Sequence, residues 1–140
     1  MAFRIKFFCE ILFRVLHFKL HRANFVFKSC HWMKYFVSYT TRDAEVTIDL
    51  LKAFSNELEK IGKVFIDIID NNSKDKQSRV IAELDSSDIL LLIETKNIYQ
   101  SNWVSIEIER AQSKQIPIKI ISLNDLKRVI DDELILQIIS

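Results

Sequence analysis

The feature that most restricts the fold is the run ILLLI at residues 89–93, which is apolar at every position. A strand with one face in water alternates between apolar and polar residues, whereas a strand buried on both faces does not. Segments with helical spacing precede and follow this run. It therefore predicts the central strand of a parallel sheet that helices cover on both sides, an α/β fold.

Strands and helices are predicted to alternate along the rest of residues 34–140. Short runs rich in aromatic and β-branched residues predict three further strands, at 35–39, 64–69 and 116–121. Between them, apolar residues three or four apart predict helices after Asp43, at 75–86 and at 102–114. Asp43 is the expected N-cap of the first helix, and Gly62 is its expected end.

Beyond Asn124 the pattern allows two interpretations. Apolar residues from Leu126 to Ile138 fit a helix, but 133–139 could also form a fifth strand. Ligands of parallel sheets bind beyond the carboxyl ends of the strands, so we expect the site in the loops that follow these strands.

The chain of 140 residues has one Gly and one Pro, which excludes glycine-rich phosphate-binding loops. The two Cys and three His all fall within residues 9–31, with no spacing typical of a metal site. No metal and no cofactor is therefore expected. The two Cys favour reduced thiols and a cytoplasmic protein.

Residues 1–33 differ in composition from residues 34–140. The first segment has six basic residues and one acid, whereas the second has a net charge of −4. Residues 1–33 thus form a basic, Phe-rich leader with three interpretations: a dispensable segment, a helix packed on the domain, or a helix by which residues 1–32 contact a membrane or a partner. The acidic second segment argues against nucleic-acid binding.

Glu107 is predicted to lie on the apolar face of the helix at 102–114. At about 100° per residue, Glu107 lies about 40° from Trp103 and between Trp103 and the apolar residues that face the core. A carboxylate there must be paired or must face a cleft. One alternative is an ordinary surface pair with Arg110, three residues on.

Residues 35–122 resemble a TIR (Toll/interleukin-1 receptor) domain of the bacterial kind. The blocks that support the resemblance, in order, are KYFVSYTTRD at 34–43, VFIDIID at 64–70, SSDILLLI at 86–93, SNWVSIEIERA at 101–111 and IPIKII at 116–121. TIR domains have a similar F-[IV]-S-Y end to the first strand and an S-x-W-x-x-x-E helix, whose positions Ser101, Trp103 and Glu107 occupy. The loop at 70–74 lacks the Gly that is usual in the family.

The resemblance implies a flavodoxin-like parallel sheet in the order 2-1-3-4-5. In many TIR domains it also implies cleavage of NAD+ at the nicotinamide–ribose bond, with Glu107 as the catalytic residue. NAD+ is then a substrate rather than a cofactor. The substrate-binding residues implied are those near the ends of the first two strands and on the third helix: Ser38, Tyr39, Thr40, Arg42, Asp67, Ile68 and Trp103.

The chemistry of this reaction agrees with a single carboxylate. Nicotinamide leaves a cationic pyridinium as a neutral molecule, so no acid has to protonate it. Positive charge develops on the ribose, as in other glycosyl transfers, and one buried carboxylate can stabilise it. The product is ADP-ribose or a cyclic form of it.

The resemblance also implies partners. TIR sites are commonly completed by another TIR domain, so homo-oligomerisation is expected. Small TIR proteins of antiphage (Thoeris-like) systems make a nucleotide signal that a separate effector reads. The alternative function is a non-catalytic adaptor that binds other TIR domains through the 68–74 loop. Two other flavodoxin-like folds are alternatives: a nucleoside deoxyribosyltransferase relative and, less well supported, a phosphorelay receiver with Asp67 as its acceptor.

Overall fold

The computed structural model describes residues 32–132 and 135–139. Of the leader predicted at 1–33, residues 1–31 lie outside the described residues, and Met33 is the first residue of β1. Within those residues, no helix combines the length and the apolar character needed to cross a membrane.

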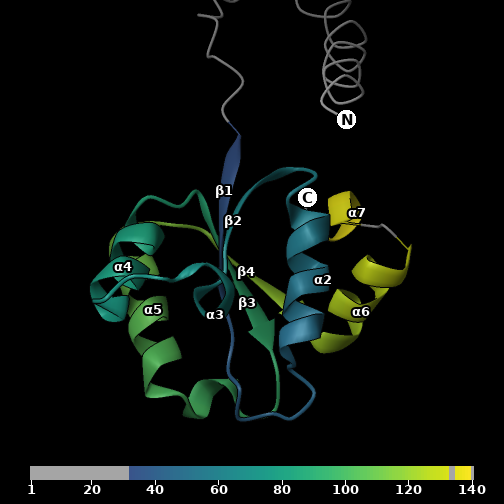
Figure 1. Ribbon diagram of the computed structural model, residues 1–140, viewed down its shortest axis with the longest axis horizontal. Coiled ribbons are helices and arrows are strands. Elements are labelled where there is room, and N and C mark those ends of the chain that lie inside the picture. The colour runs from purple at the N-terminus through teal and green to yellow at the C-terminus, as the bar shows by residue number, and fades with distance from the viewer. Residues whose placement is uncertain (1–31, 133–134, 140) are drawn as a thin grey trace, which may run out of the picture. The chain divides into compact units, whose positions relative to one another are not determined.

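Four parallel strands form the centre of the described fold (Figure 1). In chain order they are β1 (Met33–Ser38), β2 (Gly62–Phe65), β3 (Ile89–Glu94) and β4 (Ile118–Ser122). Their order in the sheet is β2-β1-β3-β4. Phe36 of β1 is in register with Phe65 on one side and with Leu90 on the other. The predicted parallel α/β sheet is confirmed, and residues 90–93 of its central strand are buried.

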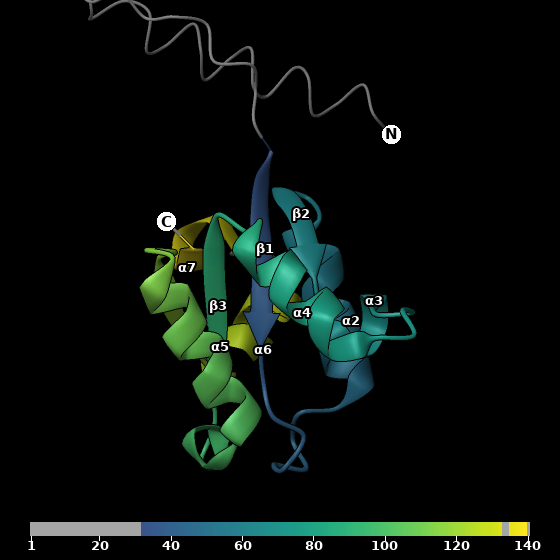
Figure 2. The same ribbon diagram turned by 90° about the vertical axis from the view of Figure 1, so that its left-hand side faces the viewer.

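Helices cover both faces of this sheet (Figures 1 and 2). One face packs against α2 (Ile48–Leu58), α6 (Leu123–Asp132) and α7 (Ile135–Ile139), and the other against α4 (Lys76–Asp85) and α5 (Asn102–Ser113). Two short elements complete the fold, α3 (Asp67–Asp70) and the 3₁₀ turn η1 (Ile98–Gln100). Because side chains of a strand alternate, the core divides into one cluster on each face.

Both predicted ends of the first helix are wrong. Thr47, not Asp43, is the N-cap of α2, and its side chain accepts a hydrogen bond from the backbone N–H of Leu50 at 3.2 Å. The helix ends at Leu58, and Gly62 is the first residue of β2 instead. A Cβ at Gly62 would clash with the carbonyl oxygen of Met33 and with the Tyr35 ring, so glycine here permits the close approach of β1.

The predicted strand at 64–69 is only partly correct. β2 ends at Phe65, and Asp67, which the prediction placed within the strand, begins the one-turn helix α3. Asp70 stabilises this turn, because its carboxylate accepts a hydrogen bond from the backbone N–H of Ile66 at 2.7 Å. The apolar run at 64–69 therefore continues past Phe65, the last residue that pairs with β1.

The C-terminal segment is helical where the structure describes it. Ser122 ends β4, and its hydroxyl accepts a hydrogen bond from the N–H of Asp125 at 3.1 Å, which starts α6 directly. Leu126, Val129 and Ile135 are buried against the sheet. The alternative of a strand at 133–139 is thus wrong for residues 135–139, and the predicted order 2-1-3-4-5 holds for its first four strands only.

Candidate functional site

Glu107 is a buried carboxylate on the face of α5 that packs against the sheet. The helix starts at its N-cap Ser101, whose hydroxyl accepts from the N–H of Val104 at 3.5 Å. From that start, the buried positions are Val104, Glu107 and Ala111. Glu107 is only 4% exposed, so it needs a polar partner inside the protein.

That partner is Ser38, the last residue of β1. Phe36 belongs to the core cluster beneath α4 and α5, and Ser38, two residues further, points to the same side of the sheet. The Ser38 hydroxyl donates a hydrogen bond to Oε2 of Glu107 at 2.5 Å, and Ser38 is itself 1% exposed. Strand β1 and helix α5 thus place one buried donor against one buried carboxylate.

Arg110 does not pair with Glu107. Its guanidinium makes two hydrogen bonds to the Asp85 carboxylate at the end of α4, at 2.8 and 2.7 Å. The alternative interpretation of Glu107 as the surface partner of Arg110 is therefore wrong.

Burial raises the pKa of Glu107 from 4.5 to about 7. The negative charge of Asp67 also contributes to this rise in pKa, whereas hydrogen bonding from Ser38 and Trp103 opposes it. The carboxyl group thus titrates near neutral pH, where a general base is most effective.

A cavity of about 190 Å³ opens beside Glu107. Its lining comes from the end of β1 and the loop after it, from α3, and from the start of α5: Val37, Tyr39, Thr40, Thr41, Asp67, Ser101, Trp103 and Glu107. Cavities that bury whole ligands measure about 300–1,000 Å³. This cavity, which we call the Glu107 cavity, therefore has room for part of a large ligand only.

Tyr39 links the Glu107 cavity to α3. Its phenol oxygen accepts a hydrogen bond from the backbone N–H of Ile68 at 3.2 Å. Burial raises the pKa of Tyr39 to about 12, so the phenol stays neutral. Asp67, the first residue of α3, accepts a hydrogen bond from the Asn71 side chain at 2.6 Å. This bond holds the second carboxylate of the cavity in place.

The structure brings together most of the residues that the sequence singles out. Tyr39, Thr40, Asp67 and Trp103 line the cavity with Glu107, and Ser38 contacts that carboxylate. Two others lie outside the lining: Arg42 is exposed, and Ile68 is 44% exposed and contributes only its backbone N–H.

Val37 is a lining residue that the sequence did not indicate. It is otherwise a core residue of a central strand, and nothing in the sequence distinguishes it from the other apolar positions of β1.

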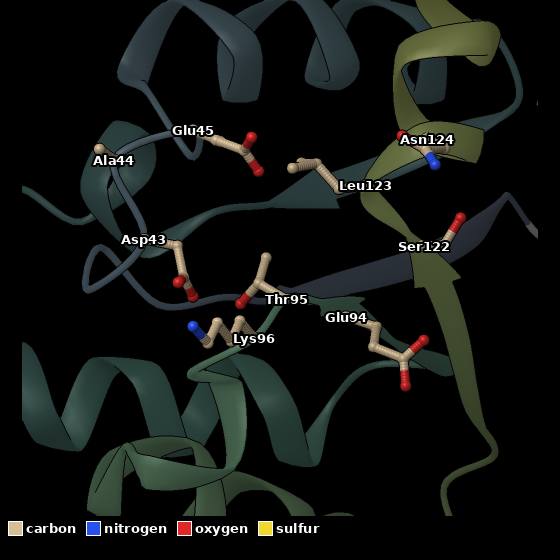
Figure 3. A pocket seen from close by; sticks show the side chains of 9 residues that line it. All are labelled: Asp43, Ala44, Glu45, Glu94, Thr95, Lys96, Ser122, Leu123 and Asn124. Atoms are coloured by element: carbon tan, nitrogen blue, oxygen red, sulfur yellow. The ribbon is translucent and has the colours of Figure 1, made fainter.

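A larger cavity, of about 520 Å³, lies at the carboxyl ends of β3 and β4 (Figure 3). Its lining is Asp43, Ala44, Glu45, Glu94, Thr95, Lys96, Ser122, Leu123 and Asn124. Glu45, Glu94 and Lys96 are exposed to solvent. Asp43 is hydrogen-bonded to Asn97, and Ser122 to Asp125. Although this cavity is larger, it contains no buried ionisable group with a perturbed pKa, so we place the candidate site at Glu107.

No group of three or more His, Cys, Asp or Glu side chains suited to a metal ion occurs among residues 32–132 and 135–139. Comparisons of the chain with protein-family models, with curated proteins and with solved structures found no match.

Proposed function

We propose that the protein is a TIR-type enzyme that cleaves NAD+ at the nicotinamide–ribose bond. The observation that supports this most is the buried Glu107 carboxylate, held by Ser38 beside an open cavity at the carboxyl ends of two strands. A carboxylate on the solvent-exposed face of a helix is stabilised by water, without a buried hydrogen-bond donor or an adjacent cavity. The sequence resemblance independently singles out the same residue.

In the proposed reaction, the bond between the ribose C1′ and the nicotinamide nitrogen breaks, and both electrons leave with the neutral nicotinamide. The ionised Glu107 stabilises the positive charge that develops at C1′. Water then adds its oxygen to C1′ and loses a proton to give ADP-ribose, or a nitrogen of the adenine ring adds instead and gives a cyclic product. Glu107, with a pKa of about 7, is suited to accept that proton.

Two further features support the binding of a cationic group, such as the nicotinamide ring of NAD+, in the Glu107 cavity. Asp67 and Glu107 both line the Glu107 cavity, which favours a pyridinium ring over an anion. Trp103 lines the same cavity, and an aromatic face attracts a cation. Because the cavity holds only part of a dinucleotide, the proposal includes completion of the site by a second copy of the chain.

A non-catalytic adaptor remains the second candidate function. Ile68 on α3 is 44% exposed, in the segment through which an adaptor would bind another TIR domain. The same exposed residue would also serve self-association of an enzyme, so it favours contact with a partner without excluding catalysis.

The test is NAD+ turnover by the concentrated full chain, with products separated by chromatography. We compare the wild type with Glu107→Gln and with a control, Glu94→Gln, which changes an exposed carboxylate of the larger cavity. We expect the wild type and the control to release nicotinamide at the same rate and Glu107→Gln to lose about 100- to 1,000-fold or more. Folded wild type without turnover, or equal rates for Glu107→Gln, would overturn the proposal and favour the adaptor.

A further inference from the structure

One carboxylate joins two loops that lie far apart in the sequence. Asp43 lies in the loop between β1 and α2, and Asn97 lies in the loop between β3 and η1. Oδ2 of Asp43 accepts from the backbone N–H of Asn97 at 3.1 Å, and Oδ1 accepts from its side-chain amide at 2.6 Å. We call this pair of hydrogen bonds the Asp43–Asn97 clamp. Figure 3 shows Asp43 directed toward Thr95 and Lys96 of the second loop.

Each of the two loops leads into one wall of the Glu107 cavity. The first loop contains the lining residues Thr40 and Thr41, shortly before Asp43. The second leads through η1 to Ser101 and to α5, which supplies Trp103 and Glu107. The hydrogen bond between Ser38 and Glu107 spans these same two walls. The clamp therefore joins the two walls at a second point, outside the cavity.

One other hydrogen bond of the first loop, from the N–H of Ile68 to the phenol oxygen of Tyr39, reaches α3, and the next two are local. The N–H of Arg42 donates to the Thr40 hydroxyl, and the N–H of Val46 donates to the carbonyl of Asp43. They shape the loop but do not join it to α5. The Thr95 hydroxyl, followed by the Asn97 donors and the charge of Lys96, lowers the pKa of Asp43. Asp43 is thus ionised at neutral pH, which strengthens both bonds to Asn97.

We propose that Asp43 is a positioning residue for the candidate site, which fixes the spacing of its two walls through Asn97 so that Glu107 stays desolvated against Ser38. This inference rests on the proposed function for its kinetic consequences, but its structural consequence can be measured without turnover. Misplacement of a catalytic group by about 1 Å can lower a rate about 100-fold, so a clamp remote from the reacting atoms can control the rate.

The test exchanges the two partners. Asp43→Asn removes the charge, and Asn97→Asp places two carboxylates face to face. The double variant again has one amide and one carboxylate. The new amide nitrogen at position 43 can donate to the new carboxylate at position 97, and the amide oxygen at position 43 still accepts from the backbone N–H of residue 97. The control is Asp125→Asn, which alters a carboxylate in the first turn of α6 that accepts a hydrogen bond from Ser122. Thermal unfolding establishes that each variant is folded.

The kinetic readout is NAD+ turnover. We expect kcat to fall about 10- to 100-fold in each single variant, with a smaller change in KM. The double variant should recover to within about threefold of the wild type, and the control should match the wild type. Folded single variants with wild-type kcat, or a double variant as slow as the singles, would overturn the proposal.

A second readout does not depend on the reaction. The chain has two Trp residues, so in a Trp32→Phe background the tryptophan fluorescence comes from Trp103, which lines the same cavity as Glu107. Its pH titration should have a midpoint near 7 with the clamp intact. Water that enters between separated walls should move the midpoint toward 4.5 in the single variants, and the double variant should restore it. If the midpoint is unchanged in the single variants, the proposed role of Asp43 as a positioning residue is wrong. If the midpoint shifts but the protein does not turn over NAD+, only the proposed function is wrong.

Discussion

The two cavities at the carboxyl ends of the strands differ in size and in chemistry. The larger one, at β3 and β4, measures about 520 Å³ and presents Glu45, Glu94 and Lys96 to solvent. The smaller one, at β1 and α5, measures about 190 Å³ and contains a carboxylate that is 4% exposed. Water solvates the exposed charged side chains of the larger cavity. In the smaller cavity, the carboxylate of Glu107 is buried, so ionisation costs the free energy of desolvation.

The volume of a cavity is therefore a poor guide to its chemistry in this fold. A solvated carboxylate such as Glu94 interacts weakly with a developing charge, because water screens it. A desolvated carboxylate interacts strongly, and the protein has to stabilise it with a donor such as Ser38. The larger cavity nevertheless borders the Asp43–Asn97 clamp, since Asp43 is one of its lining residues.

The largest expected effect is on stability. Glu107→Gln should unfold less easily than the wild type at pH 8, by up to about 3 kcal/mol, because folding raises the pKa of Glu107 from 4.5 to about 7. In the wild type, this contribution to stability is fully present below pH 4.5. It is lost between pH 4.5 and 7, where the unfolded chain ionises first.

Urea denaturation at pH 4 and pH 8 measures this difference. The two proteins should be equally stable at pH 4, and Glu94→Gln should match the wild type at both pH values, since Glu94 is exposed. If Glu107→Gln is less stable than the wild type at pH 8, or if its free energy of unfolding changes equally at both pH values, then Glu107 is not destabilised by burial and the two cavities do not differ in this respect.

The next effect is on the rate of the proposed reaction as a function of pH. The value of kcat/KM should rise with pH and level off above about pH 7, because only ionised Glu107 stabilises the charge on the ribose. At pH 5, two units below that pKa, kcat/KM should be about 100-fold lower. The rate of nicotinamide release, measured between pH 5 and 9, gives this pH dependence of kcat/KM. Glu94→Gln should give the same profile, and a flat profile would contradict the role of Glu107.

Much of this architecture follows from local sequence patterns. The uninterrupted apolar run at 89–93 predicts a strand buried on both faces, and β3 is such a strand. Helical periodicity places Glu107 among the apolar positions of α5, and it is buried there. These two predictions succeed because each depends on the geometry of a single element.

The wrong predictions depend on contacts between elements. Asp43 has the residue type of an N-cap, but its carboxylate binds Asn97, 54 residues away, and Thr47 caps α2 instead. Gly62 has the residue type of a helix end, but β1 lies so close that only glycine fits. The partner of Glu107 is likewise 69 residues away, on another element. The spacing of apolar residues along one element cannot predict these contacts, because each of them joins two different elements.

A smaller effect is expected from Ser38→Ala. The hydrogen bond from Ser38 lowers the pKa of Glu107, so its loss should move the rise in kcat/KM to a pH above 7. At pH 7 the rate should fall about three- to tenfold, and it should recover at pH 9. Ser55→Ala is the control, because Ser55 is also a buried serine that donates to a carboxylate, that of Glu59 on the far side of the sheet. A rate loss that persists at pH 9 would mean that Ser38 acts by some means other than the pKa of Glu107.

The smallest effect is expected from Arg110→Met. Arg110 lies one turn beyond Glu107 on α5, but its side chain is partly exposed and its guanidinium binds Asp85 rather than Glu107. An exposed pair of this kind contributes little, so kcat/KM and its pH profile should stay within about twofold of the wild type. Asp85→Asn should behave in the same way, since it breaks the same pair from the other side. A tenfold loss, or a shifted profile in Arg110→Met alone, would show that the guanidinium reaches Glu107 during the reaction, and the carboxylate would then be paired at the surface rather than desolvated in its cavity.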